Sequence, residues 1–228
     1  SNINQYITVF ENININMNTI STDGVLFSGT GVNSIAQFIL QNVVITGTST
    51  GGSAIRTTNT GFDGTNTSRI SLVNCLVQAT IPSGFPMIDI GGYVSLYLMN
   101  ECQVSGSSSG SSLLNIGPLP ASAITIANTS FQQQRDVSII TTSSPYPTTI
   151  TNCFLYMGST TTDLSGATSP LIQLNGSVGL PTAPFTARNN QIISSTTAAV
   201  QNLIQLTGGA NNLYLERSEE HTSELQSH

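Results

Sequence analysis

Hydrophobic and polar residues alternate in short stretches along the whole chain, and two of these stretches are nearly identical. "PLIQLNG" begins at Pro170, and "NLIQLTG" begins at Asn202, 32 positions later. Related stretches recur along the chain, and the second residues of their apolar cores are Leu26, Ile55, Ile88, Leu114, Ile140, Ile172 and Ile204. Neighbouring members are 26 to 33 residues apart, which is the period of a repeat protein.

A second signature, in which alternating apolar residues run into an asparagine, is interleaved with the first. Examples are "FILQN", "ISLVN", "LYLMN" and "ITIAN". The asparagines of this column are Asn42, Asn74, Asn100, Asn128, Asn152 and Asn189. A third short alternating stretch follows each of them, and no segment shows a sustained 3.6-residue apolar stripe. Each repeat therefore predicts about three short strands separated by turn residues.

Units of this length bury no core alone, but they do so when stacked. Over nearly all of residues 5–215, the pattern resembles the right-handed parallel β-helix of pectate-lyase-like proteins. The resemblance implies an all-β fold, with residues 1–216 forming a single right-handed parallel β-helix of about seven coils and three short strands per coil. A seven-unit propeller fits less well, because each blade needs about 40 residues and four strands.

The two ends of the chain are unlike its middle. Residues 217–228, "RSEEHTSELQSH", carry four of the sixteen charged residues and both histidines. This string resembles the translation of a sequencing-library adapter, so we expect an artefactual or disordered tail with no part in the fold. The chain starts "SNINQ" without an initiator Met, and we expect the β-helix domain to be a fragment or a mature form.

Composition excludes several classes of partner. The net charge is −6, with five Arg and no Lys, so no cationic track for nucleic acid is expected. No stretch approaches the roughly 18 consecutive apolar residues of a spanning helix, so no membrane insertion is expected. Ile, Val and Thr are plentiful, which favours an ordered β-rich chain over a disordered one.

The asparagine column is expected to be structural. It lies where one strand bends into the next, and asparagine tolerates the left-handed conformation that such a bend requires. Stacked carboxamides also hydrogen-bond one another along the axis of a ladder. We expect this ladder to face inward, which would make Asn128 inaccessible in the folded chain.

The three cysteines, Cys75, Cys102 and Cys153, follow a ladder asparagine by one, two and one positions. A one-residue bulge at Glu101 would place all three in one inward column. Cys75 and Cys102 would then be neighbours, and we favour buried free thiols, although their redox state stays open. Three scattered cysteines without histidine predict no zinc site, and we expect no metal and no cofactor.

The residues that follow the second position of each "LIQL" stretch are expected to face outward. They are Phe27, Arg56, Asp89, Asn115, Thr141, Gln173 and Gln205. In enzymes that the chain resembles, the equivalent groove often binds extended sugars. The resemblance therefore implies glycan binding by Arg56, Asp89, Asn115, Gln173 and Gln205. A surface ion pair between Arg56 and Asp89, worth under about 1 kcal/mol, is the plainer interpretation.

The residues that precede the second residue of each "LIQL" stretch are apolar, and two interpretations of them are open. If they lie at a corner of the coil, they complete the core. If they face outward, they form an apolar stripe that would support a homo-oligomer. The stripe would consist of Met87, Leu113, Ile139, Leu171 and Leu203.

No catalytic residue is predicted. Hydrolases of this fold use two or three clustered carboxylates, yet only Asp89 lies on a groove-facing strand, and Asp23, Asp63, Asp136 and Asp163 lie outside the strands. We therefore expect a non-catalytic structural or adhesive β-helix on a virion or cell surface, extracellular and contacting a polysaccharide or surface glycan. The alternative is a carbohydrate-active enzyme, either a polysaccharide lyase or a glycoside hydrolase.

Overall fold

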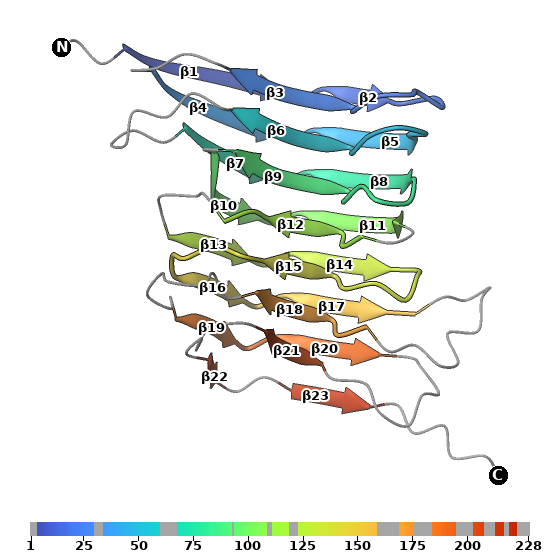
Figure 1. Ribbon diagram of the computed structural model, residues 1–228, viewed down its shortest axis with the longest axis vertical. Coiled ribbons are helices and arrows are strands. Elements are labelled where there is room, and N and C mark those ends of the chain that lie inside the picture. Colours follow the sequence, from blue (N-terminus) through green and yellow to red (C-terminus); the bar gives the residue numbers. More distant parts are fainter. Residues whose placement is uncertain are drawn as a thin grey trace.

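Three parallel β-sheets wind into one right-handed β-helix in the computed structural model. The chain passes through sheet 1, sheet 2 and sheet 3 in turn and then returns to sheet 1 one level further along the axis (Figure 1). The amino-terminal coil lies at one end of the stack and the carboxy-terminal coil at the other. The structure describes residues 4–29, 34–59, 68–92, 94–108, 111–118, 123–158, 169–175, 184–194, 203–207, 213–216 and 219–222.

Each strand pairs in parallel with the strand three elements away along the chain. Sheet 1 contains β1 (Asn4–Glu11), β4 (Ser34–Gln41), β7 (Ser68–Val73), β10 (Val94–Asn100), β13 (Ile124–Ala127), β16 (Thr148–Thr151), β19 (Phe185–Arg188) and β22 (Leu213–Glu216). Sheet 2 contains β2 (Asn14–Asn16), β5 (Val44–Thr48), β8 (Leu76–Ile81), β11 (Gln103–Ser108), β14 (Ser130–Gln133), β17 (Phe154–Met157), β20 (Gln191–Ser194) and β23 (Glu219–Thr222). Sheet 3 contains β3 (Val25–Gly29), β6 (Ile55–Asn59), β9 (Ile88–Gly92), β12 (Leu114–Ile116), β15 (Ile140–Thr142), β18 (Ile172–Asn175) and β21 (Ile204–Thr207).

The fold class predicted from the repeat is confirmed. Sheets 1 and 2 have eight strands and sheet 3 has seven, so seven coils carry all three strands. β22 and β23 add two strands of an eighth coil, which is slightly more than the seven expected. The "LIQL" column is in register over its central part, where Ile88, Leu114 and Ile140 pair in succession.

The register of the first coil differs from the prediction by one residue. Val25 pairs with Ile55, so Leu26 faces outward, 51% exposed, and Phe27 faces the core, 6% exposed. The prediction that Phe27 points outward is wrong. Side chains alternate between the two faces of a strand, so a slip of one residue inverts every assignment in it. Phe27 packs its ring 4.5 Å from the ring of Phe38, which stabilises the observed register.

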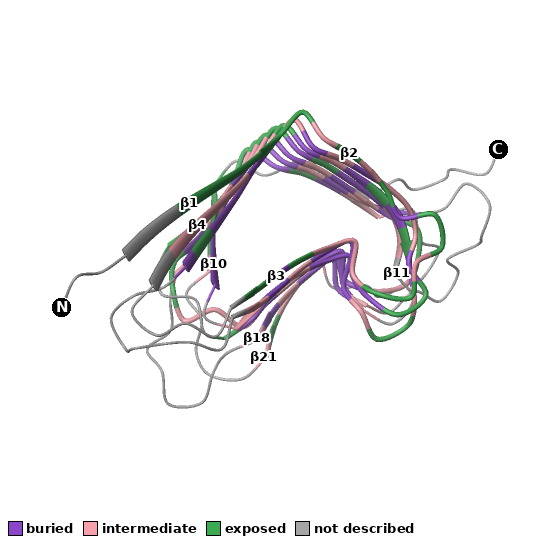
Figure 2. Cartoon of the chain, turned by 90° about the horizontal axis from the view of Figure 1, so that it is seen from above, coloured by how far each residue is buried: buried purple, intermediate pink, exposed green. Residues whose placement is uncertain are grey.

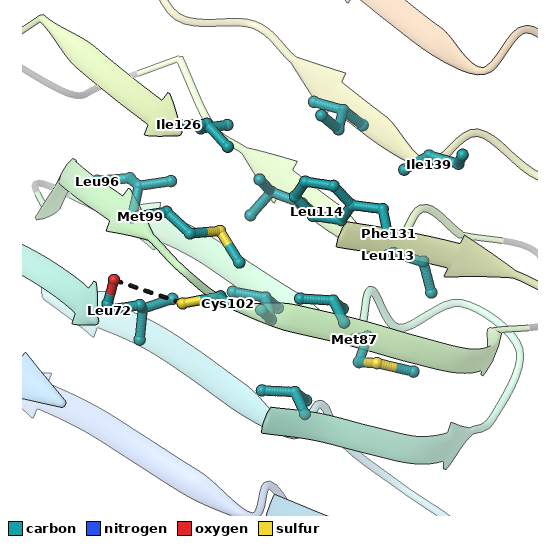
Figure 3. Close-up of a cluster of buried hydrophobic side chains, with 14 of the residues drawn as sticks. Leu72, Met87, Leu96, Met99, Cys102, Leu113, Leu114, Ile126, Phe131 and Ile139 are labelled. Carbon is teal, nitrogen blue, oxygen red and sulfur yellow. Dashed lines mark hydrogen bonds between the residues drawn. The ribbon is translucent and has the colours of Figure 1, made fainter. Parts of the chain in front are cut away.

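The core runs along the axis and is filled by the inward columns of all three sheets. Viewed along the axis, buried residues occur in the strands of all three sheets (Figure 2). In the middle of the stack, Met99 and Ile126 from sheet 1 lie beside Phe131 from sheet 2 and Leu114 from sheet 3 (Figure 3), and all four are 0% exposed. Burying an aromatic ring such as that of Phe131 contributes about 1.5–3 kcal/mol.

The apolar column that precedes each sheet 3 strand completes this core. Met87, Leu113, Ile139 and Leu171 are all 0% exposed, and Leu203 is half-buried. The corner interpretation is therefore confirmed, and the alternative of an outward apolar stripe is wrong. Any homo-oligomer would have to use other residues.

The chain turns from sheet 1 into sheet 2 at a residue in the left-handed conformation. Its φ angle is 56° at Asn12, 55° at Asn42, 50° at Asn74, 54° at Glu101, 49° at Asn128, 52° at Asn152 and 52° at Asn189. Asparagine adopts this conformation more readily than other non-glycine residues. The predicted turn role is thus confirmed for every ladder asparagine except Asn100, whose neighbour Glu101 takes the position instead.

The side-chain amides at this turn hydrogen-bond from coil to coil, as expected of a ladder. The bonds run from Asn42 Nδ2 to Asn12 Oδ1 (3.1 Å), Asn74 to Asn42 (2.7 Å), Asn128 to Asn100 (2.9 Å) and Asn152 to Asn128 (3.3 Å). Asn42 and Asn100 are half-buried and the other ladder asparagines are exposed, so the expectation that the ladder faces inward is wrong. The left-handed turn directs the amides outward and leaves the inward position to the next residue.

A bulge in the fourth coil lies at Tyr97 and not at Glu101 as predicted. The pairing between β10 and β7 shifts between Leu96 and Leu98, so Tyr97 is the extra residue. This shift places Asn100 opposite Val73 and lengthens the strand by one position before its turn. The ring of Tyr97 is exposed, and the guanidinium of Arg69 lies 5.2 Å from its centre.

Part of the tail is incorporated into the sheet. β23 (Glu219–Thr222) pairs with β20 at the end of sheet 2, which differs from the disorder expected for those four residues. Residues 217–218 and 223–228 lie outside the described residues. Whether the tail contributes to stability stays a prediction. No helix long and apolar enough to cross a membrane occurs in the part of the chain that the structure describes.

Candidate functional site

The outer face of sheet 3 forms a shallow polar groove. Figure 2 shows the coil turning inward where it enters this sheet, at the strands that include β3 and β18. Arg56, Asp89 and Asn115 occupy one row across three neighbouring strands. They alternate with inward residues such as Ile55 and Ile88, which is why their side chains project outward.

These three side chains form a continuous chain of contacts. Arg56 Nε lies 3.5 Å from Asp89 Oδ2, and Asn115 Nδ2 donates a hydrogen bond to Asp89 Oδ1 over 2.8 Å. The Arg56 side chain is 37% exposed, so its ion pair with Asp89 contributes about 0–1 kcal/mol. Both carboxylate oxygens of Asp89 are thus occupied by neighbours on the same sheet.

Asp23 joins this cluster, and the sequence pattern did not indicate it. Its Oδ2 lies 3.9 Å from Arg56 Nη1, and its Oδ1 accepts a hydrogen bond from the backbone N–H of Ser53 over 2.8 Å. Asp23 precedes β3 and belongs to no strand. The one available signal was its position two residues before Val25, at the corner where each coil enters sheet 3.

A hollow of about 300 Å³ lies further along the groove. Its lining residues come from β12, β15 and β18 and from the corners that precede these strands. They are Ser111, Ser112, Asn115, Val137, Ser138, Thr141, Ser169 and Gln173. The lining carries hydroxyl and amide groups, which both donate and accept hydrogen bonds, and no charged side chain.

A carboxylate behind the hollow holds part of its wall in place. Asp136 Oδ1 accepts a hydrogen bond from the backbone N–H of Ser169 over 2.9 Å, and Ser169 Oγ donates to the carbonyl of Asp136 over 3.0 Å. Asp136 therefore orders the corner between the coils of β15 and β18. Asp63 and Asp163 lie outside the described residues.

The predicted groove residues fall into two groups. Arg56 and Asp89 belong to the charged cluster, Gln173 lines the hollow, and Asn115 belongs to both. Gln205 pairs with Gln173 in the next coil and lies one strand beyond the hollow. Their outward orientation is confirmed, whereas their role in glycan binding stays a prediction.

At six of the seven left-handed turns, the residue that follows the turn points into the core. These residues are Val43, Cys75, Cys102, Thr129, Cys153 and Asn190, all of them buried. Ile13, which follows Asn12, is half-buried. The prediction of one inward column of buried free cysteines is confirmed. No group of three or more metal-ligating side chains occurs within the described ranges.

Comparison of the chain with models of protein families, with curated proteins and with solved structures finds no match. The parallel β-helix architecture is shown by the sheets themselves.

Proposed function

We propose that this chain is a non-catalytic, structural or adhesive β-helix of the pectate-lyase-like type, which contacts a neutral glycan along the groove of sheet 3. The observation that carries the proposal is the hollow of about 300 Å³ lined by hydroxyl and amide groups. Its size lies at the lower end of the range for small-ligand pockets, about 300–1,000 Å³. A sugar ring presents hydroxyl groups that both donate and accept, and Asn115, Thr141 and Gln173 offer the matching groups.

The charge distribution favours a neutral sugar over an acidic one. Asp23 and Asp89 share the single guanidinium of Arg56, so the charged cluster beside the hollow carries one net negative charge. The chain as a whole carries −6. An anionic polysaccharide would therefore be repelled both by the charged cluster and by the net charge of the whole chain.

The architecture of the molecule agrees with a location on a virion or cell surface. Each sheet is a continuous parallel ladder, and a single apolar core runs through the stack. Such a solenoid is rigid along its axis, and its groove repeats with the coils. These properties suit an extracellular or virion-surface protein that holds its binding face away from the surface to which it is attached.

A carbohydrate-active enzyme is the second candidate, and the convergence of Asp23 and Asp89 on Arg56 favours it. These two carboxylates belong to the first and third coils, so their separation along the axis is about 10 Å. Glycoside hydrolysis needs two carboxyl groups roughly 5–9.5 Å apart with a sugar or water between them. Here the guanidinium of Arg56 lies between them, which makes this candidate the weaker one.

The test measures the binding of neutral and acidic oligosaccharides to the full chain, by calorimetry or on glycan arrays. We expect weak binding of at least one neutral oligosaccharide, lost in Gln173→Ala and Thr141→Ala. Gln78→Ala, at an exposed position of β8 on sheet 2, is the matched control and should bind as the native chain does. Binding that survives both groove variants, or binding of oligogalacturonate alone, would contradict the proposal.

A further inference from the structure

Cys75 and Cys102 lie directly opposite each other in neighbouring coils. Leu76 pairs with Gln103, and the backbone N–H of Gln103 donates to the carbonyl of Cys75 over 2.8 Å, so the two cysteines occupy the same level of the corner column. Neighbouring strands are about 4.8 Å apart. This spacing falls within the Cα separation of about 4.4–6.8 Å that a disulfide spans.

Main-chain carbonyls orient both thiols toward the same side. Cys75 Sγ donates to the carbonyl of Leu40 over 3.3 Å, and Cys102 Sγ donates to that of Leu72 over 3.5 Å, as Figure 3 shows for Cys102. The pair is therefore a preformed dithiol.

A second hollow, of about 330 Å³, borders this pair at the surface. It lies at the corner between sheets 1 and 2, and its lining includes both cysteines together with Asn42, Asn74 and Glu101. The asparagine ladder is interrupted here, because Glu101 takes the turn position and no amide bond between Asn74 and Asn100 is present among the described residues. The dithiol is thus buried, with exposed fractions of 4% and 3%, and yet borders a cavity.

We propose that Cys75 and Cys102 form a redox-active dithiol site, which a small-molecule disulfide oxidises to a disulfide that joins the third and fourth coils. The observations that carry this proposal are the opposed register of the two cysteines and the hollow that both of them line.

The reaction proceeds in two balanced exchange steps. The Cys75 thiolate attacks one sulfur of the reagent, forms a mixed disulfide and releases the first reagent thiolate. Cys102 then attacks Cys75 Sγ, forms the Cys75–Cys102 bond and releases the second reagent thiolate. The two protein thiols lose two electrons, the reagent disulfide gains them, and the two thiol protons end on the released reagent thiols.

The two thiols differ in acidity. The neighbouring Cys102 lowers the pKa of Cys75 to about 7, so Cys75 is the attacking thiolate. Its neighbour Cys75, together with burial, raises the pKa of Cys102. Once Cys75 is tied up in the mixed disulfide, Cys102 no longer has a thiolate beside it and can give up its proton.

Cys153 serves as an internal control for the reactivity of the pair. It belongs to the same column and is equally buried, but the coil that carries Thr129 separates it from Cys102, and it does not line the hollow. Burial raises its pKa to about 11. We therefore expect Cys153 to stay reduced under conditions that oxidise the pair.

The test uses the native full chain, reduced and then treated with hydroxyethyl disulfide. After quenching, remaining thiols are alkylated in denaturant and the chain is cut with trypsin. Because the chain has no Lys, cleavage after Arg69, Arg135 and Arg188 puts Cys75 and Cys102 in peptide 70–135 and Cys153 in peptide 136–188. We expect peptide 70–135 to lose two hydrogen atoms without alkylation, and peptide 136–188 to be fully alkylated.

Variants separate the two steps. Cys102→Ser should stop at the mixed disulfide on Cys75, Cys75→Ser should leave Cys102 unreacted, and Cys153→Ser should oxidise as the native chain does. Serine should be tolerated in this column, because Thr129 already donates its hydroxyl to the carbonyl of Ala127 there, over 2.8 Å.

Two results would overturn the proposal. One is a native peptide 70–135 that carries two alkyl groups after treatment, since the pair would then have failed to oxidise. The other is modification of Cys153 at the same rate as Cys75, since reactivity would then reflect general unfolding and not a built site.

Discussion

The side-chain amide of Asn74 donates a hydrogen bond to Oδ1 of Asn42 over 2.7 Å, although the two residues are 32 positions apart. Both residues have a left-handed backbone, and the bond between their amides lies at the surface. The same residue type therefore satisfies a local demand of the turn and makes a contact between coils. Glu101 interrupts this arrangement, because a glutamate in the left-handed conformation meets neither demand as well.

Glu101→Asn should stabilise the chain, by about 0.5–1 kcal/mol, because asparagine relieves the strain of the left-handed backbone. Asn74→Ala should destabilise it by about 1–2 kcal/mol, through that strain and the loss of an exposed hydrogen bond. Denaturant unfolding measures both values. Asn14→Ala, at an exposed position of β2 outside the turn, is the control and should change little. Equal effects of the two alanine variants would refute the role assigned to the ladder.

Asp89→Asn should leave any sugar interaction of the groove in place and should remove no catalytic activity. We expect no cleavage of polygalacturonate or of neutral polysaccharides by the native chain, and no calcium binding at micromolar levels, because calcium requires about six to eight oxygen ligands, usually with several carboxylates. Reducing-sugar assays and calcium titration measure these properties. Turnover by the native chain that disappears in Asp89→Asn would show that the enzyme alternative is correct.

Deleting residues 217–228 should leave the midpoint of thermal unfolding unchanged within error. β23 pairs only with β20 and lies at the end of the stack, so its removal exposes one edge and disturbs no inner coil. Thermal unfolding of the full-length and the truncated chain measures this difference. A fall of several degrees, which corresponds to more than about 1 kcal/mol for a chain of this size, would show that the tail belongs to the fold.

The rate at which the native chain consumes hydroxyethyl disulfide should rise with pH and reach half of its maximum near pH 7. The thiolate is the attacking form, and the neighbouring Cys102 lowers the pKa of Cys75 to about 7. The rate is therefore low at pH 5 and close to its plateau above pH 8. Cys102→Ala removes this neighbour and should move the midpoint upward, toward the value of about 8.5 typical of a free thiol. An unchanged midpoint in that variant would refute this account of the pKa.

The sequence by itself determined the repeat, the class of fold and the positions of the turns. These features depend on local preferences: alternation along a strand, and the tolerance of Asn42, Asn128 and Asn152 for a left-handed backbone. Stacking then follows, because no single unit buries a core. The outward row of Arg56, Asp89 and Asn115 was predicted for the same reason, since its members occupy matching places in successive repeats.

Only the tertiary structure decided what depends on a shift of one residue or on the meeting of distant segments. Packing of Phe27 into the core inverted the first strand of sheet 3, and the bulge at Tyr97 set which residue of the fourth coil takes the turn. Neither shift alters the local pattern, so alternation cannot reveal it. Asp23 reaches Arg56, and Cys75 meets Cys102, because stacking places successive coils about 4.8 Å apart along the axis. That distance is set by hydrogen bonds between coils, which no stretch of sequence contains.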